Sequence, residues 1–369
     1  MEYREYRPGD EKQLNDLYNE VFSRRRTIEQ WKWQYRDAPA GPSTIVVIDH
    51  GGEIVGHEAM IPLHFHAFGR DIIGGKFEDN YVSERQRGKG LFGPLVDYCA
   101  EAGARAGYGF SFGMAARNVP YRIHIHRGYR HLGSLNAFFA PLRPAEAASE
   151  IARALHFSAP KRLAMRVGMR LLSGRFERKT ARSAAGRSGA YAIETIARFD
   201  ERFDSLWRDF VKTERVFTIA RSSAFLNWRY IDNPYRKYAV FAARSDDRVV
   251  AYLCAAVVVR DDMDLRLKVG VIPDFLALPG HEETYAQLVG RAVEAWRSEG
   301  AETAILWTHA EGEHIRPLVA EAKRRGLVST YGRYDIPVLV KLFDPEVDTD
   351  SFYDIRRWHL TQAFSAAWV

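Results

Sequence analysis

A short basic segment rich in glycine is the part of the sequence best suited to bind a charged ligand. It reads Arg85-Gln86-Arg87-Gly88-Lys89-Gly90. Residues 76–82 before it are typical of a β-strand, and the apolar positions that follow keep helical spacing from Leu91 to Cys99. The segment therefore joins a strand to the start of a helix, where unpaired N–H groups and the helix dipole attract anions. The glycines let the backbone approach a phosphate, and the basic side chains add long-range attraction, so we expect a pyrophosphate to bind here.

Two adjacent carboxylates, Glu78 and Asp79, come just before this loop. Strand alternation would place them on opposite faces of a sheet, so only one could face a bound ligand and act as a general base. Two histidine pairs, His64-Phe65-His66 and His124-Ile125-His126, would each share a face if their segments were strands. No carboxylate or cysteine pattern accompanies them, and we expect no metal site.

The loop and its surroundings resemble the GNAT superfamily of acyl-CoA-dependent N-acyltransferases. The motif of that superfamily is Arg/Gln-x-x-Gly-x-Gly/Ala between its fourth strand and third helix, and Arg85, Gly88 and Gly90 match every specified position. The resemblance implies transfer of an acetyl or other acyl group from acetyl-CoA or another acyl-CoA to a primary amine, without a metal. It also implies that acyl-CoA contacts come from Val82, Arg85, Gln86, Arg87, Gly88, Lys89, Gly90, Leu91 and Asn118.

The segment after the next strand also resembles the superfamily, from Asn118 through Gly128-Tyr129. The superfamily places a catalytic tyrosine a few residues before that glycine, whereas this chain has His124-Ile125-His126 there. The resemblance therefore leaves two candidates for the general acid, Tyr121 and His124.

An internal repeat organises the chain. Residues 33–39 and 228–234 share Trp, Tyr, Asp and Pro at an offset of 195, and the apolar run and turn at 45–52 fall on 240–247 at the same offset. Each copy is typical of a helix, a strand, a tight turn and a second strand. We therefore predict an α+β fold with two GNAT-like domains, each a mixed central β-sheet flanked by helices.

The two copies differ at the phosphate loop. At the offset of 195 the second copy has Pro279-Gly280-His281-Glu282-Glu283-Thr284-Tyr285, where acidic residues replace basic ones and would repel an anion. We expect a catalytic acyl-CoA-binding domain at 1–142 and a degenerate GNAT-like domain at 189–369.

The repeat also distinguishes the roles expected for the two carboxylates. Asp79 falls on Asp274, in the copy without the basic loop, whereas Glu78 falls on Pro273. An aspartate present in both copies is expected to have a structural role, so we prefer Glu78 as the general base and keep Asp79 as the alternative.

Residues 143–188 are predicted to be a basic helical connector. Arg162, Arg166 and Arg170 are spaced four apart, and an apolar stripe of Leu163, Val167 and Leu171 runs beside them. The simplest interpretation is a helix packed on the domains with solvated arginines. The alternative is a weak membrane-surface or acidic-polymer contact through 161–182.

The composition of the chain indicates its domain number, its compartment and the kinds of partner it can have. The chain has 369 residues, 46% apolar and 27% charged, as expected for a soluble protein of about two domains. Its two cysteines suggest no disulfide framework, and its longest apolar run, 249–259, is too short to span a bilayer. We expect a cytoplasmic monomer with pseudo-dimeric tandem domains. The net charge of +6 favours an anionic partner, but no nucleic-acid-binding module is present, and we expect no nucleic acid.

The acceptor is expected to be a small-molecule amine. Tandem GNAT domains with a Trp-x-Tyr…Pro segment resemble proteins of bacterial polysaccharide synthesis, so an amino sugar or another cell-envelope precursor is preferred. Two alternatives stay open: aminoacyl transfer to a peptidoglycan precursor, as in Fem-like proteins, and a non-catalytic protein that binds acyl-CoA.

Overall fold

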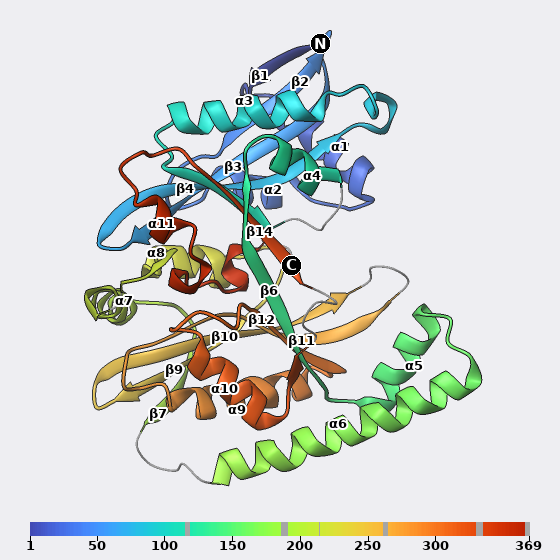
Figure 1. Ribbon diagram of the computed structural model, residues 1–369, viewed down its shortest axis with the longest axis vertical. Helices are drawn as coiled ribbons and strands as arrows, with labels where there is room; N and C mark the ends of the chain where they lie inside the picture. The colour runs from blue at the N-terminus through green and yellow to red at the C-terminus, as the bar shows by residue number, and fades with distance from the viewer. Residues whose placement is uncertain (115–118, 186–190, 214, 261–264, 330–334, 366–369) are drawn as a thin grey trace.

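One mixed sheet runs through the whole molecule, and helices cover it (Figure 1). The computed structural model describes residues 1–114, 119–185, 191–213, 215–260, 265–329 and 335–365. The strand order is β1-β2-β3-β4-β5-β14-β6-β12-β11-β10-β9-β7, with β8 beside β3 and β13 beside β6. The strands are β1 (Glu2–Glu5), β2 (Thr44–His50), β3 (Glu53–Ala67), β4 (Arg70–Val82), β5 (Phe110–Met114), β6 (Arg130–Pro141), β7 (Ala192–Ile196), β8 (Phe217–Ile219), β9 (Ala239–Ser245), β10 (Arg248–Arg260), β11 (Leu267–Ala277), β12 (Thr303–Thr308), β13 (Val328–Ser329) and β14 (Ile336–Leu342).

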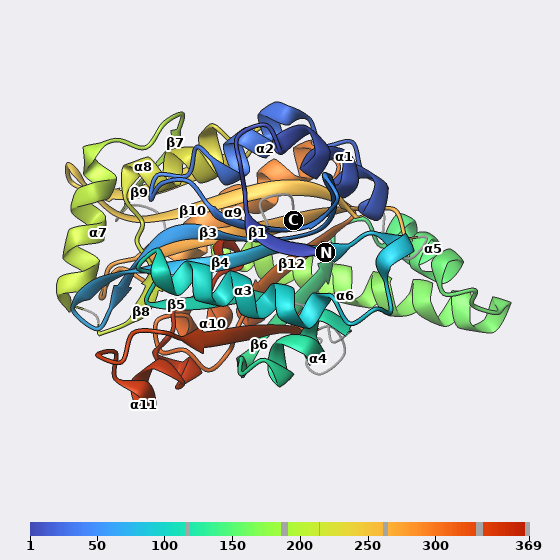
Figure 2. The ribbon, with the colours of Figure 1, turned by 90° about the horizontal axis from the view of Figure 1, so that it is seen from above.

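The expected mixed sheet flanked by helices is confirmed. Seen from above, the strands of the first half lie between α3 on one side and α1 and α2 on the other (Figure 2). The helices are α1 (Glu11–Phe22), α2 (Ile28–Tyr35), α3 (Phe92–Arg105), α4 (Val119–His126), α5 (Pro144–Ala154), α6 (Ala159–Ala185), α7 (Glu201–Thr213), α8 (Ser223–Leu226), α9 (Thr284–Ser298), α10 (Arg316–Arg325) and α11 (Thr349–Phe352), with a π-helical turn at Asn227–Ile231 and short 3-10 turns at Glu84–Gln86, Ile355–Arg357 and Gln362–Phe364.

Two strands connect the first and second halves of the chain. The last strand, β14, pairs antiparallel with both β5 and β6, so the C-terminal segment contributes a strand to the sheet of the first half. The long strand β6 pairs with β14 near its start and with β12 over residues 136–141. The strands of both halves therefore form one continuous path of hydrogen bonds, which the sequence pattern did not predict.

The offset of 195 is visible in the element bounds. Strands β2 and β9 begin and end 195 residues apart, β3 and β10 begin so, and β4 and β11 end so. Helix α2 and helix α8 also begin at this offset. Hence the helix and the hairpin predicted for each copy are present in both.

The two copies meet through their repeated tryptophans. The rings of Trp33 and Trp228 stack with centroids 4.8 Å apart. Each indole N–H donates to the backbone carbonyl of the other residue at 3.1 Å. This reciprocal contact satisfies both buried indole donors and fixes α2 against the π-helical turn.

The two copies also contain buried arginine–aspartate pairs at equivalent positions, related by the same offset. Arg26 lies 2.5 Å from Asp79, and Arg221 lies 2.9 Å from Asp274. All four side chains are at most 3% exposed. A charge so deeply buried requires its partner, so these pairs connect the fourth strand of each copy to the segment before its helix.

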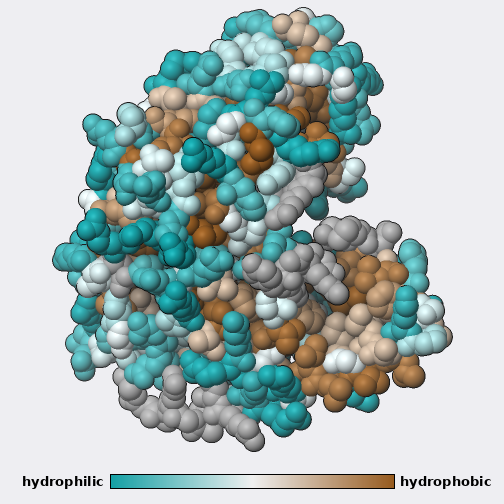
Figure 3. Space-filling view, viewed as in Figure 1, coloured by the Kyte–Doolittle hydropathy of each residue, from teal (hydrophilic) through white to brown (hydrophobic). Residues whose placement is uncertain are grey.

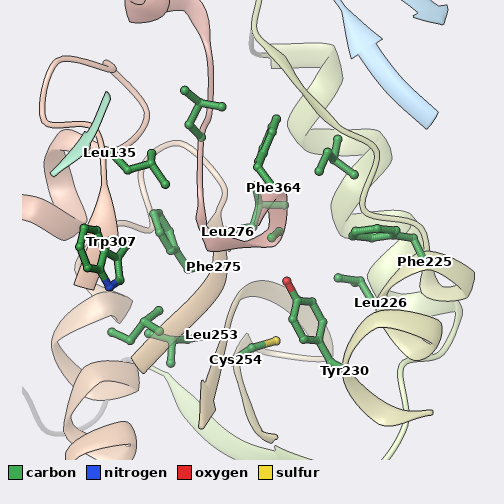
Figure 4. Close-up of a cluster of buried hydrophobic side chains, with 14 of the residues drawn as sticks. Leu135, Phe225, Leu226, Tyr230, Leu253, Cys254, Phe275, Leu276, Trp307 and Phe364 are labelled. Carbon is green, nitrogen blue, oxygen red and sulfur yellow. The ribbon is translucent and has the colours of Figure 1, made fainter. Parts of the chain in front are cut away.

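The hydrophobic core is shared between the halves. Figure 4 shows Leu135 of β6 and Trp307 of β12 beside Leu253 and Phe275 of the second copy, with Phe364 from the C-terminal segment packed nearby. A separate cluster of buried residues lies between α3 and the sheet of the first half. The core is thus continuous across the two copies.

The predicted connector is helical, as α5 and α6, but the predicted apolar stripe does not pack on the protein. Leu163 and Leu171 are 65% and 69% exposed. The helix instead buries Met169 and Phe176. Helical periodicity identifies faces of a helix, but it does not say which face the rest of the fold will cover.

Candidate active site

A large cavity opens where the glycine-rich loop meets the end of β4. It has a volume of about 820 Å³ and is bounded by β4, the loop, the start of α3, helix α4 and the end of α1. Its lining residues are Val21, Phe22, Asn80, Tyr81, Val82, Gln86, Arg87, Gly88, Gly90, Leu91, Phe92, Gly93, Val119, Pro120, Ile123, His126 and Arg127. Apolar and basic side chains therefore surround the same space.

The loop has the backbone geometry of an anion site. Gly88 and Gly90 adopt φ values of +78° and +73°, which favour glycine, and a Cβ at either position would meet nothing within 4 Å. The N–H groups of residues 88–91 donate to no acceptor within the described ranges, and α3 begins directly afterwards. Free N–H groups at a helix start suit a phosphate group.

Most of the predicted acyl-CoA contacts lie on this cavity. Val82, Gln86, Arg87, Gly88, Gly90 and Leu91 line it, whereas Arg85 and Lys89 do not. The Nζ of Lys89 donates to Gln86 Oε1 at 2.7 Å. Asn118 lies outside the described residues. Sequence reasoning missed Arg127 and His126, whose basic side chains reach the cavity from α4 and its end.

Strand β4 reaches the cavity with one edge open. Within the described ranges it pairs with β5 only over Gly74–Lys76 and Phe110–Phe112, although β4 continues to Val82. The backbone beyond Lys76 therefore has polar groups on its β5 side that a ligand can reach.

The two predicted carboxylates do not point to opposite faces, so that expectation is wrong. Asp79 has a φ of +50°, and β4 carries one more residue than β3 between the pairs Ala59–Glu78 and His57–Tyr81. This bulge interrupts the alternation. Both carboxylates consequently lie on the side of the sheet that faces α2.

Asp79 is fully engaged in buried contacts. It accepts from Arg26 and from the hydroxyl of Tyr35. The Nε of Arg26 in turn donates to Asn15 at 2.8 Å. Asp79 is not among the residues that line the cavity.

Glu78 is buried beside a lysine with a perturbed pKa. Its carboxylate contacts the ammonium group of Lys76. Burial, together with the nearby charge of Arg229, lowers the pKa of Lys76 to about 7. Lys76 lines a small hollow between the two copies, together with Gln34, Trp228 and Arg229. Glu78 therefore lies toward the second copy, behind the cavity.

A second polar cluster adjoins the cavity. Of its members, only His124 was identified from the sequence. His124 is buried on α4, where its Nδ1 donates to the carbonyl of Pro120 at 2.8 Å. Because a carbonyl only accepts, Nε2 is left to accept from the amide of Asn80 at 3.2 Å. Glu58 of β3 is fully buried, 3.5 Å from the same Nε2, and its Oε2 accepts no hydrogen bond from a described residue. Since Asn80 lines the cavity, this cluster connects the core with the ligand space.

Glu58 could have been found from the sequence. It follows His57 in the middle of a strand that is otherwise mainly apolar, and ionisable residues in such a place are usually buried with partners. Tyr121, the other candidate acid, is half-buried on α4, with its ring 6.0 Å from that of His131.

The histidine pair at 124–126 lies on a helix rather than a strand, so its two side chains do not share a face. His124 points into the protein and His126 to the cavity. No group of three or more His, Cys, Asp or Glu side chains in the described ranges is arranged to hold a metal ion.

The corresponding turn of the second copy has side-chain contacts of its own. The hydroxyl of Tyr191 donates to Glu283 at 3.0 Å and lies 3.1 Å from His281. An acidic side chain and an aromatic ring therefore lie at the turn before α9, where the first copy has its basic loop.

Comparison with known proteins agrees with this geometry. Residues 2–131 match the family model described as an acetyltransferase (GNAT) domain. A search of curated proteins found no match. None of the described helices is both long and apolar enough to cross a membrane.

Solved structures with a similar fold cover both copies. A GCN5-related N-acetyltransferase from Anabaena variabilis is 11% identical with a TM-score of 0.60, over 93% of this chain and 72% of that one. A probable N-acyltransferase from Enterococcus faecalis is 9% identical with a TM-score of 0.61, over 93% and 72%. Saccharomyces cerevisiae N-myristoyltransferase with bound myristoyl-CoA is 9% identical with a TM-score of 0.56, over 92% and 82%. At these identities the likeness concerns the fold.

The fold and the cavity thus define an acyl-CoA-dependent N-acyltransferase. Residues 2–131 match a GNAT acetyltransferase domain, and the fold of the whole chain is similar to that of solved GNAT structures. Acetyl-CoA or another acyl-CoA is the co-substrate of this class. The free N–H groups and the two open glycines of the loop fit the pyrophosphate of such a molecule.

Proposed function

We propose that the protein transfers an acetyl or other acyl group to the primary amine of an amino sugar or another cell-envelope precursor. The observation that carries the proposal is the cavity of about 820 Å³, because it joins the open phosphate loop to the unpaired edge of β4. The preference for an envelope precursor rests on the repeated Trp-x-Tyr…Pro segment, whose tryptophans form the contact between the copies.

The proposed arrangement is a cytoplasmic monomer made of two GNAT-like domains, the second of them degenerate. The offset of 195 in the element bounds and the two equivalent buried ion pairs support this duplication. The acidic residue bonded to Tyr191 at this turn supports the assignment of acyl-CoA binding to the first copy alone, because it would repel an anion.

For the chemistry, we propose Glu78 as the general base. The attacking amine must lose a proton. Glu78 lies behind the cavity, two residues beyond the last described pair between β4 and β5, so it would take this proton through an intervening water. It lies next to a lysine that can exchange a proton near neutral pH. His124 or Tyr121 then supplies the proton for the leaving thiolate. The bond from Asn80 connects the imidazole of His124 with the cavity, but Nε2 accepts in that bond and carries no proton to give, so the hydroxyl of Tyr121 stays an equal candidate.

The test is thiol release from acetyl-CoA in the presence of a panel of amino sugars, amino acids and polyamines. We expect turnover with at least one amino sugar and none with the polyamines. CoA binding without release of thiol for any amine would indicate a binding protein. Transfer only from an aminoacyl donor would indicate the Fem-like activity.

The role of Glu78 is tested by Glu78→Gln. We expect turnover to fall about a hundredfold, and the rise of the rate with increasing pH to disappear from the pH–rate profile. The affinity for CoA should stay unchanged. Asp79→Asn and His124→Gln serve as comparisons. Near-normal turnover in Glu78→Gln would refute the assignment, and loss of activity with an intact fold in Asp79→Asn would identify Asp79 as the base instead.

A further inference from the structure

Helices α5 and α6 project an unusual apolar surface into solvent. Eight large apolar side chains of the described residues are exposed, and half of them belong to this hairpin. They are Leu155 at the end of α5 and, on α6, Leu163, Val167 and Leu171, the last three 65%, 52% and 69% exposed. Figure 3 shows a brown area in the region where Figure 1 draws α5 and α6.

The three side chains of α6 form one row. Their four-residue spacing places them along about 12 Å of one helix face. The other side of the helix is used for packing, since Phe176 is buried against Ile272 and Val289 of the second copy. The helix is therefore held to the protein by one face while an apolar face points outward.

Positive charge accompanies this row. The span 161–182 contains eight Lys or Arg residues and a single acidic residue, Glu177. Glu177 is already bound to Arg297 at 2.5 Å. Arg166 and Arg170 are exposed and border the apolar row. The outward face thus combines apolar and basic side chains with little compensating negative charge.

We propose that this face of α6 rests on an anionic membrane surface. Such a helix lies in the interface plane, with its apolar row at the boundary of the acyl chains and its arginines at the phosphate groups. A soluble acidic polymer would be recognised by the arginines alone and gives no reason for three exposed aliphatic side chains in a row. The pairing of both features favours lipid.

The proposal is tested by co-sedimentation of the full chain with vesicles of phosphatidylglycerol and phosphatidylcholine, and with vesicles of phosphatidylcholine alone. We expect binding to the anionic vesicles that weakens with salt, and little binding to the neutral ones. Arg166→Gln/Arg170→Gln should weaken the binding about thirtyfold. Leu163→Ser/Val167→Ser/Leu171→Ser should weaken it at least about tenfold.

Two controls make the result specific. Val259→Ser removes an equally exposed apolar side chain on β10 and should leave vesicle binding unchanged. Every variant should keep the wild-type affinity for CoA, which shows that it is folded. The proposal is overturned if the wild type does not bind anionic vesicles, or if it binds heparin as tightly and the triple serine variant binds vesicles like the wild type.

A labelled variant reports insertion directly. The two natural cysteines, Cys99 and Cys254, are buried, so a fluorophore added to Val167→Cys labels α6 selectively. We expect a blue shift of its emission with anionic vesicles and none with the same label at Val259→Cys. An unshifted emission at position 167 under conditions of full binding would contradict the proposed orientation.

Discussion

The equivalence of the two buried ion pairs predicts a matched pair of stability losses. In Asp79→Asn the guanidinium of Arg26 stays in place, 1% exposed, without a negative partner. Breaking a buried pair in this way typically costs 3–5 kcal/mol, because a buried charge is left uncompensated. Asparagine keeps one acceptor oxygen, so we expect the lower end, about 3 kcal/mol.

Asp274→Asn is the matched control in the second copy. Asp274 accepts from Tyr252 at 2.6 Å and Thr361 at 2.9 Å in addition to Arg221. More donors lose their acceptor there, so we expect a loss of about 4–5 kcal/mol.

The assay is urea denaturation of the full chain at neutral pH, followed by circular dichroism, with the affinity for CoA measured in the absence of urea. We expect both variants to lose stability and both to keep CoA binding where they are folded. The reasoning is refuted if Asp79→Asn stays within about 0.5 kcal/mol of the wild type, since a buried pair cannot be so inexpensive to break. A simultaneous loss of turnover would then give Asp79 a chemical role.

Three further outcomes are expected. Gly88→Glu should abolish CoA binding in a folded protein, because it places a carboxylate at the anion site. Gly280→Glu, with a similar φ of +83° and equally open surroundings, should leave CoA binding unchanged. Equal losses of CoA affinity in the two variants, measured by calorimetry, would assign the effect to backbone strain. Burial lowers the pKa of His57 to about 4, so the folded state takes up a proton less readily than the unfolded state, and stability is lost as pH falls from about 6.5 toward 4. His57→Phe should reduce this slope by about 1.4 kcal/mol per pH unit in urea titrations, and an unchanged slope would place the acid sensitivity elsewhere. Trp33→Ala and Trp228→Ala should each cost about 3–5 kcal/mol, and the double variant clearly less than the sum, because the second change removes contacts already lost; strict additivity would contradict the reciprocal stacking.

Local patterns predicted the parts of the fold that depend on local sequence. The offset of 195 located the hairpins of both copies, and the glycine spacing located a loop of which several residues line the cavity beside β4. The left-handed Asp79 was not predictable, because no residue nearby signals a bulge and its conformation is held by Arg26, distant in sequence. The segment 124–126 was ambiguous for a similar reason, since a short histidine pair fits a strand or a helix. Glu58 was overlooked because its partner lies 66 residues away on another element.

The place of β14 bears on how the protein is made. Synthesis proceeds from the N-terminus, and early segments begin to fold before the later ones exist. Strand β5 can pair with β4 early, but it obtains its second neighbour only when residues 336–342 have been translated, so its other edge stays exposed for most of the time on the ribosome. Unpaired edges of this kind invite association between nascent chains. A gene fragment that stops at residue 142 would keep that edge permanently, and supplying the remaining segment as a second polypeptide is the way to cover it.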